Sequence, residues 1–350
     1  MRYYDIKIYP KGSTSSATPI REYTSYPMGP FGNQNDPGAL NVVIDAYVYS
    51  FAAPQQQAIV QIWGVPITEL AQANNYTNCT IQVFAGFKAG LPLNNPAQSG
   101  PILYGIIRQS FGNWTGTEMT LDFVVTVAGA LSGQDTNVSF SWLAGTSLSS
   151  ALTTTFNTAF PGVKSTININ PKLILGHDEH GVYQALPAFA QTLKRLTAAV
   201  IGGNYNGVDI TWTPQGINVF DGTNSTVTPI QIAFQDLIGQ PVWIGPNTIQ
   251  FVCPMRADIS VGTLVQMPQN APGSTANSMG VGFVTTTSAS EPQARQQSIF
   301  NGMFTIVLVH HMGIFRQPDG NAWVTVFNAN LQTQIIPPGA IATQSLSFSQ

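Results

Sequence analysis

The residues best suited to chemistry in this chain begin with a short cluster of histidines and carboxylates. His177-Asp178-Glu179-His180 places two histidines three positions apart beside two acidic residues. These side chains are of the types that bind zinc and other transition metals. The cluster follows Gly176, however, and polar residues after a glycine are typical of an exposed turn. We therefore interpret it as a solvated turn, and we assign no metal ligands to the chain.

A second pair, His310-His311, stands at the end of an apolar segment that is typical of a strand. Adjacent side chains of a strand point to opposite faces. The pattern therefore predicts that one histidine is packed in the core and that the other is exposed.

Three acidic residues, Glu118, Asp122 and Asp135, are candidates for the paired carboxylates of a glycosidase. Carboxylates at strand ends and turns are usually solvated, which favours a non-catalytic interpretation. The chain also lacks a Gly-x-Ser-x-Gly elbow, a phosphate-binding loop and a His-Glu-x-x-His helix. We predict no catalytic residues, no cofactor and no enzymatic activity.

Aromatic residues could also form a binding face for a sugar. The six tryptophans are scattered over different β-type segments, so we expect them in cores and interfaces instead. They are Trp63, Trp114, Trp142, Trp212, Trp243 and Trp323.

Charged residues are scarce throughout the chain. It contains 13 Lys and Arg and 16 Asp and Glu among 350 residues, with a net charge of -3, whereas about 25% of the residues of an ordinary soluble protein are charged. Only Glu69 carries a charge between Asp45 and Lys88, and no residue does between Asp258 and Glu291. A surface of amides and hydroxyls can be buried against a partner without the cost of desolvating ions. The composition therefore indicates a subunit of an assembly.

Several other classes are disfavoured. The basic residues form no block of the kind that binds nucleic acid tightly. Cys79 and Cys253 are too few for a disulfide framework, so we expect them to behave as small buried hydrophobic residues. The start of the sequence lacks the apolar core of a signal peptide, and no apolar run approaches the ~18 residues of a membrane span. We expect a soluble protein that is made in the cytoplasm and is not inserted into a membrane.

Most of the chain has the pattern of β-strands. Residues 1–38 are rich in Pro, Gly, Ser and Tyr, which predicts an extended arm with one strand at 3–9. Short segments rich in β-branched and aromatic residues then follow, separated by Gly, Asn and Pro, as in an antiparallel barrel or sandwich. The first set of predicted strands covers residues 40–48, 58–65, 79–87, 102–111, 118–127 and 137–142.

The middle of the chain is different, because two helices are predicted there. The first begins after Ser147 as its cap and stops at Pro161-Gly162, and the second covers residues 186–201 and ends at Gly202-Gly203. Strands at 165–169 and 207–212 complete a small α+β unit. In the first helix an apolar residue recurs at every fourth position: Leu148, Leu152, Phe156 and Phe160.

The β pattern then returns and completes a three-part plan. The predicted fold is mainly β with an α+β insert, in which two antiparallel β-barrels flank the insert. An exposed loop is expected at 268–298. The predicted domains are an arm at 1–38, a first β-domain at 39–145, the insert at 146–215 and a second β-domain at 216–350. The second set of strands covers residues 216–220, 230–234, 248–252, 263–267, 300–310 and 323–329.

The order of these segments resembles the baseplate hub proteins of contractile-tailed bacteriophages, which are relatives of the hub part of type VI secretion spikes. The resemblance to a first hub barrel lies in residues 58–65, 78–90, 103–107 and 120–123. Residues 149–169 and 181–190 are similar to the helical insert of that family. Residues 236–241, 255–262 and 300–311 look like the second barrel, which ends in His311-Met312-Gly313-Ile314-Phe315-Arg316 as an H-x-G-x-x-R pattern.

The resemblance implies a structural virion protein in the tail baseplate. Such hubs form a homotrimeric ring in which each subunit contributes two tube-like barrels, so that six similar domains face the hexameric tail tube. The implied partners are the tail tube protein, the central spike protein, other baseplate proteins and the tape measure protein. DNA would pass through the channel during ejection without specific binding. Because each Lys or Arg contact with phosphate adds affinity, we expect a neutral or acidic channel wall.

Two other interpretations are open. One is a tail-tube or capsid component of another β class, which would have one or two sandwiches and no central helical unit. The other is a carbohydrate-binding or hydrolytic tail module, which would have an open groove with clustered tryptophans and paired carboxylates.

Overall fold

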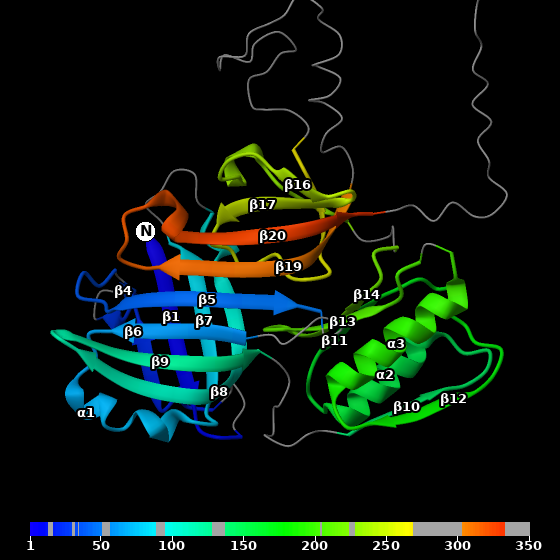
Figure 1. The fold of residues 1–350 in the computed structure, drawn as a ribbon, viewed down its shortest axis with the longest axis horizontal. Helices are drawn as coiled ribbons and strands as arrows, with labels where there is room; N and C mark the ends of the chain where they lie inside the picture. The colour runs from blue at the N-terminus through cyan, green and yellow to red at the C-terminus, as the bar shows by residue number, and fades with distance from the viewer. Residues whose placement is uncertain are drawn as a thin grey trace, which may run out of the picture.

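A computed structural model describes residues 1–12, 17–29, 32–33, 35–50, 57–88, 95–127, 137–203, 205–223, 228–268 and 303–332. The predicted fold class is confirmed, because the chain is mainly β with a separate α+β unit (Figure 1). The expected loop at 268–298 lies almost entirely outside the described residues. In the described part of the chain, no helix combines the length and the apolar character needed to cross a membrane.

The first half of the chain builds one side of a large antiparallel sheet. The strands at 41–49 and 57–63 alternate buried and outward side chains, as expected for a sheet with one face on a core. Its strands are β1 (Arg2–Tyr9), β2 (Arg21–Thr24), β5 (Asn41–Tyr49), β6 (Gln57–Trp63), β7 (Thr80–Phe87), β8 (Gly100–Thr115) and β9 (Glu118–Val127).

The second half of the chain adds its strands to the same sheet. They are β15 (Ile230–Gln231), β16 (Val242–Gly245), β17 (Thr248–Pro254), β18 (Leu264–Gln266), β19 (Met303–Ile314) and β20 (Trp323–Leu331).

These two halves were expected to form separate barrels, but their described strands form one hydrogen-bonded path. The order is β16-β17-β20-β19-β5-β6-β9-β8-β7-β1-β2, with β15 and β18 beside it, and the path does not close into a ring. β5 and β19 join the halves, because they pair from Val43 opposite Ile314 to Tyr49 opposite Leu308. The strands before and after the insert therefore share a single core.

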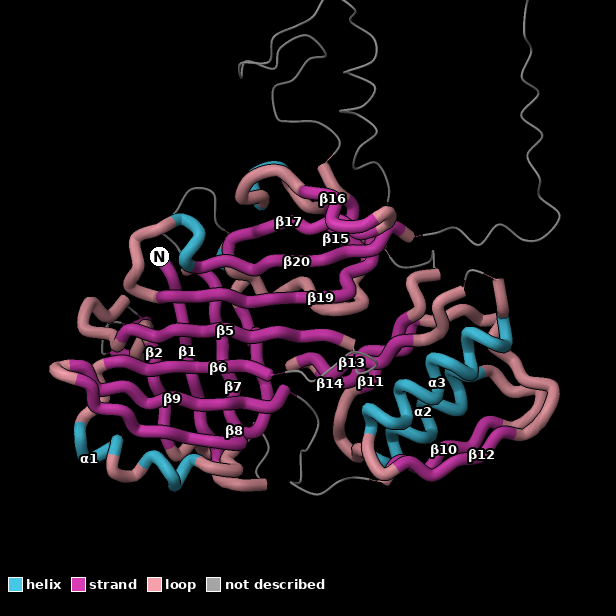
Figure 2. The backbone as a smooth tube through the Cα atoms, viewed as in Figure 1, coloured by secondary structure: helices cyan, strands magenta, loops and turns pink. Residues whose placement is uncertain are grey.

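The sheet folds over on itself, so that β1 and β7 cross behind β5, β6 and β9 (Figure 2). The sixteen residues of β8 make this possible, because one end pairs with β7 and the other with β9, with a bulge between Ile107 and Gln109. The N-terminal segment, expected to contribute one strand, contributes both β1 and β2. Its Ile6 and Ile8 are fully buried in the core.

The insert has its own core beside the sheet. Its helices match the predicted ones closely, since Ser147 caps the first and Gly202, with a φ of 70°, follows the second. The two helices lie between a two-stranded and a three-stranded sheet (Figure 1). The elements are β10 (Val138–Trp142), α2 (Leu148–Ala159), β11 (Ser165–Asn168), β12 (Glu179–Tyr183), α3 (Leu186–Ile201), β13 (Asp209–Thr213) and β14 (Gly216–Phe220).

Candidate interaction surface

The histidine and carboxylate cluster of the insert is only partly a turn, because β12 begins at Glu179. His177 is exposed, and its Nε2 lies 4.0 Å from Glu179 Oε2. His180 Nδ1 is 3.0 Å from Ser141 Oγ on β10, and Asp178 accepts a hydrogen bond of 2.7 Å from the backbone N–H of Ala144, which follows β10. Among the residues that the structure describes, no three His, Cys, Asp or Glu side chains are grouped to hold a metal ion.

The prediction for His310 and His311 is wrong, since both side chains are largely buried. β19 lies between β5 and β20, and side chains of these neighbouring strands contact both rings. His310 stacks on Tyr47 and places Nε2 2.6 Å from Asp45 Oδ1, whereas His311 Nδ1 lies 2.9 Å from Thr325 Oγ1. Burial lowers the pKa of His311 to about 3, so this ring is neutral near pH 7.

The two candidate carboxylates that the structure describes, Glu118 and Asp122, do not form a glycosidase pair. Glu118 and Asp122 are four positions apart on β9, which corresponds to about 13 Å along an antiparallel strand, beyond the ~5–9.5 Å that such pairs require. Asp122 instead accepts a hydrogen bond of 2.6 Å from Asn113 Nδ2. Asp135 lies outside the described residues.

The tryptophans divide between cores and surface. Trp142 and Trp212 are buried in the insert, and Trp323 is buried in the large sheet. Trp114, near the tip of the β8–β9 hairpin, is 64% exposed, and Trp243 on β16 is 39% exposed. The described tryptophans therefore come from separate elements and do not build one sugar-binding face.

The residues that carry the hub resemblance meet in the structure. Trp323 Nε1 donates a hydrogen bond of 3.0 Å to the carbonyl of Gly86, which lies in a stretch more than two hundred positions away. Gly313, from the H-x-G-x-x-R pattern, lies under the same indole ring, and a Cβ at this position would be 2.6 Å from it. Only glycine leaves room for the ring here. Trp323 thus connects the strands before the insert with those after it.

The arginine of the same pattern fixes the chain that leads into β5. Arg316 donates from Nη2 to the carbonyl of Pro37 at 2.9 Å and from Nε to that of Ala39 at 3.1 Å. Arg2 makes the corresponding contacts from the N-terminal strand, with Nη1 at 3.0 Å from the carbonyls of Ile314 and Phe315. Both arginines satisfy backbone carbonyls that the sheet leaves unpaired.

A buried ionic cluster holds the second half of the sheet. Arg256 is 2% exposed and binds Asp258 through two hydrogen bonds, Nε–Oδ1 at 2.7 Å and Nη2–Oδ2 at 2.6 Å. Its Nη1 lies 3.4 Å from Asp236 Oδ2. Burial alone lowers the pKa of Arg256, but Asp258 and Asp236 reverse the effect and raise it. The guanidinium is therefore charged inside the fold.

Glu69, the single charge between Asp45 and Lys88, is also buried. Its carboxylate accepts hydrogen bonds from Arg21 and Tyr23 of β2 and, at 3.0 Å, from Tyr76. These bonds attach β2 to the helical turn α1 (Ile67–Leu70). Glu69, Arg256 and Asp5 are thus the buried Asp, Glu, Lys or Arg residues in the described part of the fold.

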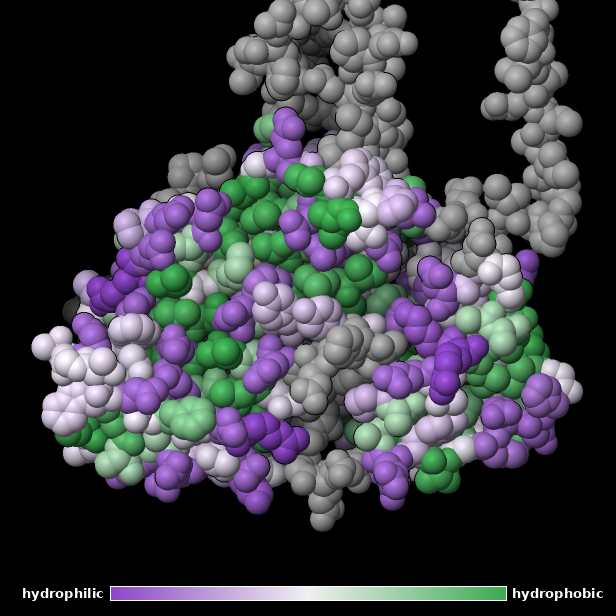
Figure 3. Space-filling view, in the orientation of Figure 1, coloured by the Kyte–Doolittle hydropathy of each residue, from purple (hydrophilic) through white to green (hydrophobic). Residues whose placement is uncertain are grey.

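The outer face of β5, β6 and β9 is a mixed surface, and Figure 3 shows its polar and apolar side chains side by side. Its outward residues include the carboxylates Asp45, Glu118 and Asp122, but no Lys or Arg. The others are mainly amides, hydroxyls and aromatic rings, such as Gln61 and Tyr47. This surface can contact a partner without desolvating many ions, and it does not attract phosphates.

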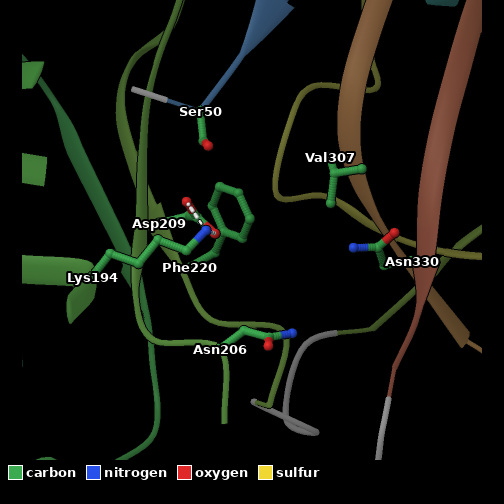
Figure 4. Close-up of a pocket in the computed structure, with 7 residues that line it drawn as sticks. All are labelled: Ser50, Lys194, Asn206, Asp209, Phe220, Val307 and Asn330. Atoms are coloured by element: carbon green, nitrogen blue, oxygen red, sulfur yellow. Dashed lines mark hydrogen bonds and ion pairs between the residues drawn. The ribbon is translucent and has the colours of Figure 1, made fainter. Parts of the chain in front are cut away.

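A cavity of about 340 Å³ lies where the insert meets the sheet (Figure 4). On the insert side, Lys194 Nζ lies 2.9 Å from both carboxylate oxygens of Asp209, so the two charges neutralise each other. The sheet side contributes Val307 and Asn330. Next to it, Thr211 Oγ1 donates to the carbonyl of Tyr49 at 2.8 Å. We interpret the cavity as a gap in the docking of two units, because its only ion pair is already satisfied.

No protein-family model matches the chain, and no curated protein matches it. Solved structures that are similar to the chain have low sequence identity. The 43 kDa tail protein of prophage MuSo2 from Shewanella oneidensis is 8% identical, with a TM-score of 0.48 over 96% of this chain and 100% of that one. A type VI secretion component from E. coli, described as similar to the bacteriophage tail proteins gp27 and gp5, is 8% identical, with a TM-score of 0.48 over 84% and 74%.

A third similar structure is a Francisella PdpA-VgrG complex, which is 7% identical, with a TM-score of 0.49 over 95% of this chain and 58% of that one. Each TM-score is below 0.5, so the role of this chain has to follow from its own residues.

Proposed function

We propose that this chain is a structural baseplate hub of a contractile phage tail. In this role three copies form a ring that connects the hexameric tail tube to the central spike and leaves a channel for DNA. Its other neighbours would be further baseplate proteins and the tape measure protein, and the chain would have no catalytic role of its own.

The observation that carries the proposal is the convergence of the resembling residues. Gly86 and Gly313 come from stretches that were matched separately by sequence order, yet both contact the buried ring of Trp323, which itself lies outside those stretches. Arg256 of the second-barrel stretch binds Asp236 of the same group of stretches. If the resemblance to hub proteins reflects the fold and not chance, the matched residues are expected to make buried contacts of this kind.

The outer face of β5, β6 and β9 supports a channel wall or a subunit contact. It has three carboxylates and no cation, so DNA would pass it without the counterion release that makes phosphate binding tight. We propose that this face lines the channel.

The first test is the mass of the purified particle by native mass spectrometry. A ring hub is expected to have three times the 37.5 kDa of one chain, and imaging of that particle should show a central channel. A stable monomer at high concentration would favour an appended binding module, and a much larger closed shell would favour a capsid component.

A second test addresses the channel wall in assembled tails. A substitution of Asp45 would also break its hydrogen bond with His310. Gln61 and Asp122, which lie opposite each other on β6 and β9, are therefore better positions for introducing lysine. The double variant Gln61→Lys with Asp122→Lys should leave the ring intact and slow DNA ejection, because the wall gains affinity for phosphate. Glu22→Lys on β2 is the matched control. Equal ejection rates for all three proteins would remove this face from the channel.

A further inference from the structure

The edge strand β16 has an unusual surface for the end of a sheet. Among the described strands it pairs only with β17, and its Val242 and Ile244 are 58% and 49% exposed. Between them, Trp243 turns the other way and packs against Phe304 of the core, with 6.2 Å between the ring centroids. This contact fixes the strand and directs the two aliphatic side chains outward. Apolar edge strands of this kind readily pair with another strand.

The opposite edge of the sheet has the protection that β16 lacks. β2 is also four residues long, but it presents Arg21 and Glu22 to solvent. Charged side chains on an edge strand discourage the addition of a further strand. The difference indicates that β16 is built to be covered and β2 is not.

The chain itself leaves the sheet beside β16. β20 ends at Leu331, whose backbone N–H donates a hydrogen bond of 2.8 Å to the carbonyl of Asn247, in the turn between β16 and β17. β16 and β20 are both antiparallel to β17, so they run in the same direction. A chain that turned back after β20 would therefore run antiparallel to β16, which is the geometry of a simple edge addition.

The sequence after Gln332 suits this position. Residues 333–350 contain no charged residue, and Pro337-Pro338-Gly339 is a turn signal. In Ser345-Leu346-Ser347-Phe348-Ser349, apolar and polar residues alternate as in a strand with one buried face. Eight extended residues reach about 26 Å, whereas the outer side of β16 is about 14 Å from β20, or three strand spacings. The linker 333–340 is therefore long enough.

We propose that residues 341–349 of the same chain add to the outer edge of β16 as an antiparallel strand. Main-chain hydrogen bonds would hold the segment, and Leu346 and Phe348 would cover Val242 and Ile244. This pairing is independent of the hub role, because it needs only the single chain.

Cysteine cross-linking tests the pairing directly. Val242→Cys combined with Leu346→Cys, or with Phe348→Cys to allow for register, should form a disulfide within one chain under mild oxidation. The native Cys79 and Cys253 are buried and stay in place. Glu22→Cys on β2 with the same tail cysteine is the matched control and should form none. Absence of a bond from Val242→Cys, or a bond that joins two chains, would overturn the proposal.

Amide hydrogen exchange gives an independent readout without new cysteines. Deletion of residues 341–350 should speed exchange in β16 by at least ~10-fold, since the outer N–H groups lose their acceptors. Exchange in β2 should not change. Leu346→Lys with Phe348→Lys should reproduce the effect of the deletion. Identical exchange in β16 for the full-length and shortened chains would contradict the proposal.

Discussion

The large sheet and the insert are stabilised in different ways. The sheet combines its apolar core with buried charges, among which Arg256 and Glu69 each bind several partners. The insert relies on aromatic packing, with Phe189 at the centre of a group of rings, and its clearest ion pair, between Lys194 and Asp209, is partly exposed. The comparison shows that the large sheet, which holds distant segments together, contains buried ionic contacts, whereas the insert is held mainly by aromatic packing.

The first prediction concerns the ionic cluster of Arg256, Asp236 and Asp258 in the sheet. Arg256→Met leaves Asp236 and Asp258 with no cation inside the fold, which should lower the free energy of unfolding by about 3–5 kcal/mol. Chemical denaturation followed by tryptophan fluorescence measures this loss. Adding Asp236→Asn and Asp258→Asn to the same variant should restore part of it. A loss below ~1 kcal/mol for the single variant would show that the cluster contributes little to the stability of the sheet.

The second prediction concerns the aromatic core of the insert. Phe189 lies 5.1 Å from Phe140 and 5.2 Å from Tyr183, measured between ring centroids. Phe189→Ala should lower stability by about 3–4 kcal/mol, in the lower part of the usual range, because the half-exposed Tyr183 ring can move inward. Hydrogen exchange should increase in the insert and not in β5 or β19. Equal increases in both regions would show that the two cores unfold as one.

The third prediction concerns the pH dependence that a buried histidine gives to the large sheet. The pKa of His311 is lowered to about 3 by burial, against about 6.5 in an unfolded chain. Between these values the unfolded state binds the extra proton, so stability should fall as the pH decreases from 6.5, by up to about 1.4 kcal/mol per pH unit.

Asp5 acts in the opposite direction in part of this window. Burial raises its pKa to about 6 from an ordinary value of 3.8, so its contribution to stability decreases as the pH rises through that range. The useful measurement is therefore the difference in slope between the native chain and His311→Asn from pH 4.5 to 6.5. Identical slopes would mean that His311 does not titrate on unfolding.

The smallest effect is expected at the surface ion pair of the insert. Lys194→Met removes the partner of Asp209, but the lysine side chain is 35% exposed, and such pairs contribute only about 0.2–1 kcal/mol. The same denaturation assay applies, and 0.5 M salt should reduce the difference further. A loss as large as that of Arg256→Met would remove the contrast between the two regions.

Local elements could be predicted well from this sequence, and long-range contacts could not. Helix α3 and strand β9 have the predicted bounds, because apolar periodicity and flanking glycines mark their ends. β16 was missed, since its four residues between Pro241 and Pro246 are too few to show a period. Alternation along β19 places His310 and His311 on opposite faces of the strand. It cannot show that side chains of neighbouring strands bury both rings.

The same limit applies to the candidate site. The resembling stretches could be ordered from sequence, but the meeting of Gly86 and Trp323 depends on how β7 and β20 fold over a shared core. The partners of Arg256 could not be assigned either, because Asp236 lies twenty positions before it and the bend that joins them has no local signature.

The pairing of β5 with β19 also has a consequence for synthesis on the ribosome. Asp45 and His310 are separated by 265 positions, so at ~5–20 residues per second β5 waits roughly 13–53 s for its neighbour. The insert lies wholly inside that interval and can fold while the first strands still have an open edge. The nascent chain therefore carries a folded unit between two unfinished halves, and a chaperone that shields β5 during this time would raise the yield of the complete sheet.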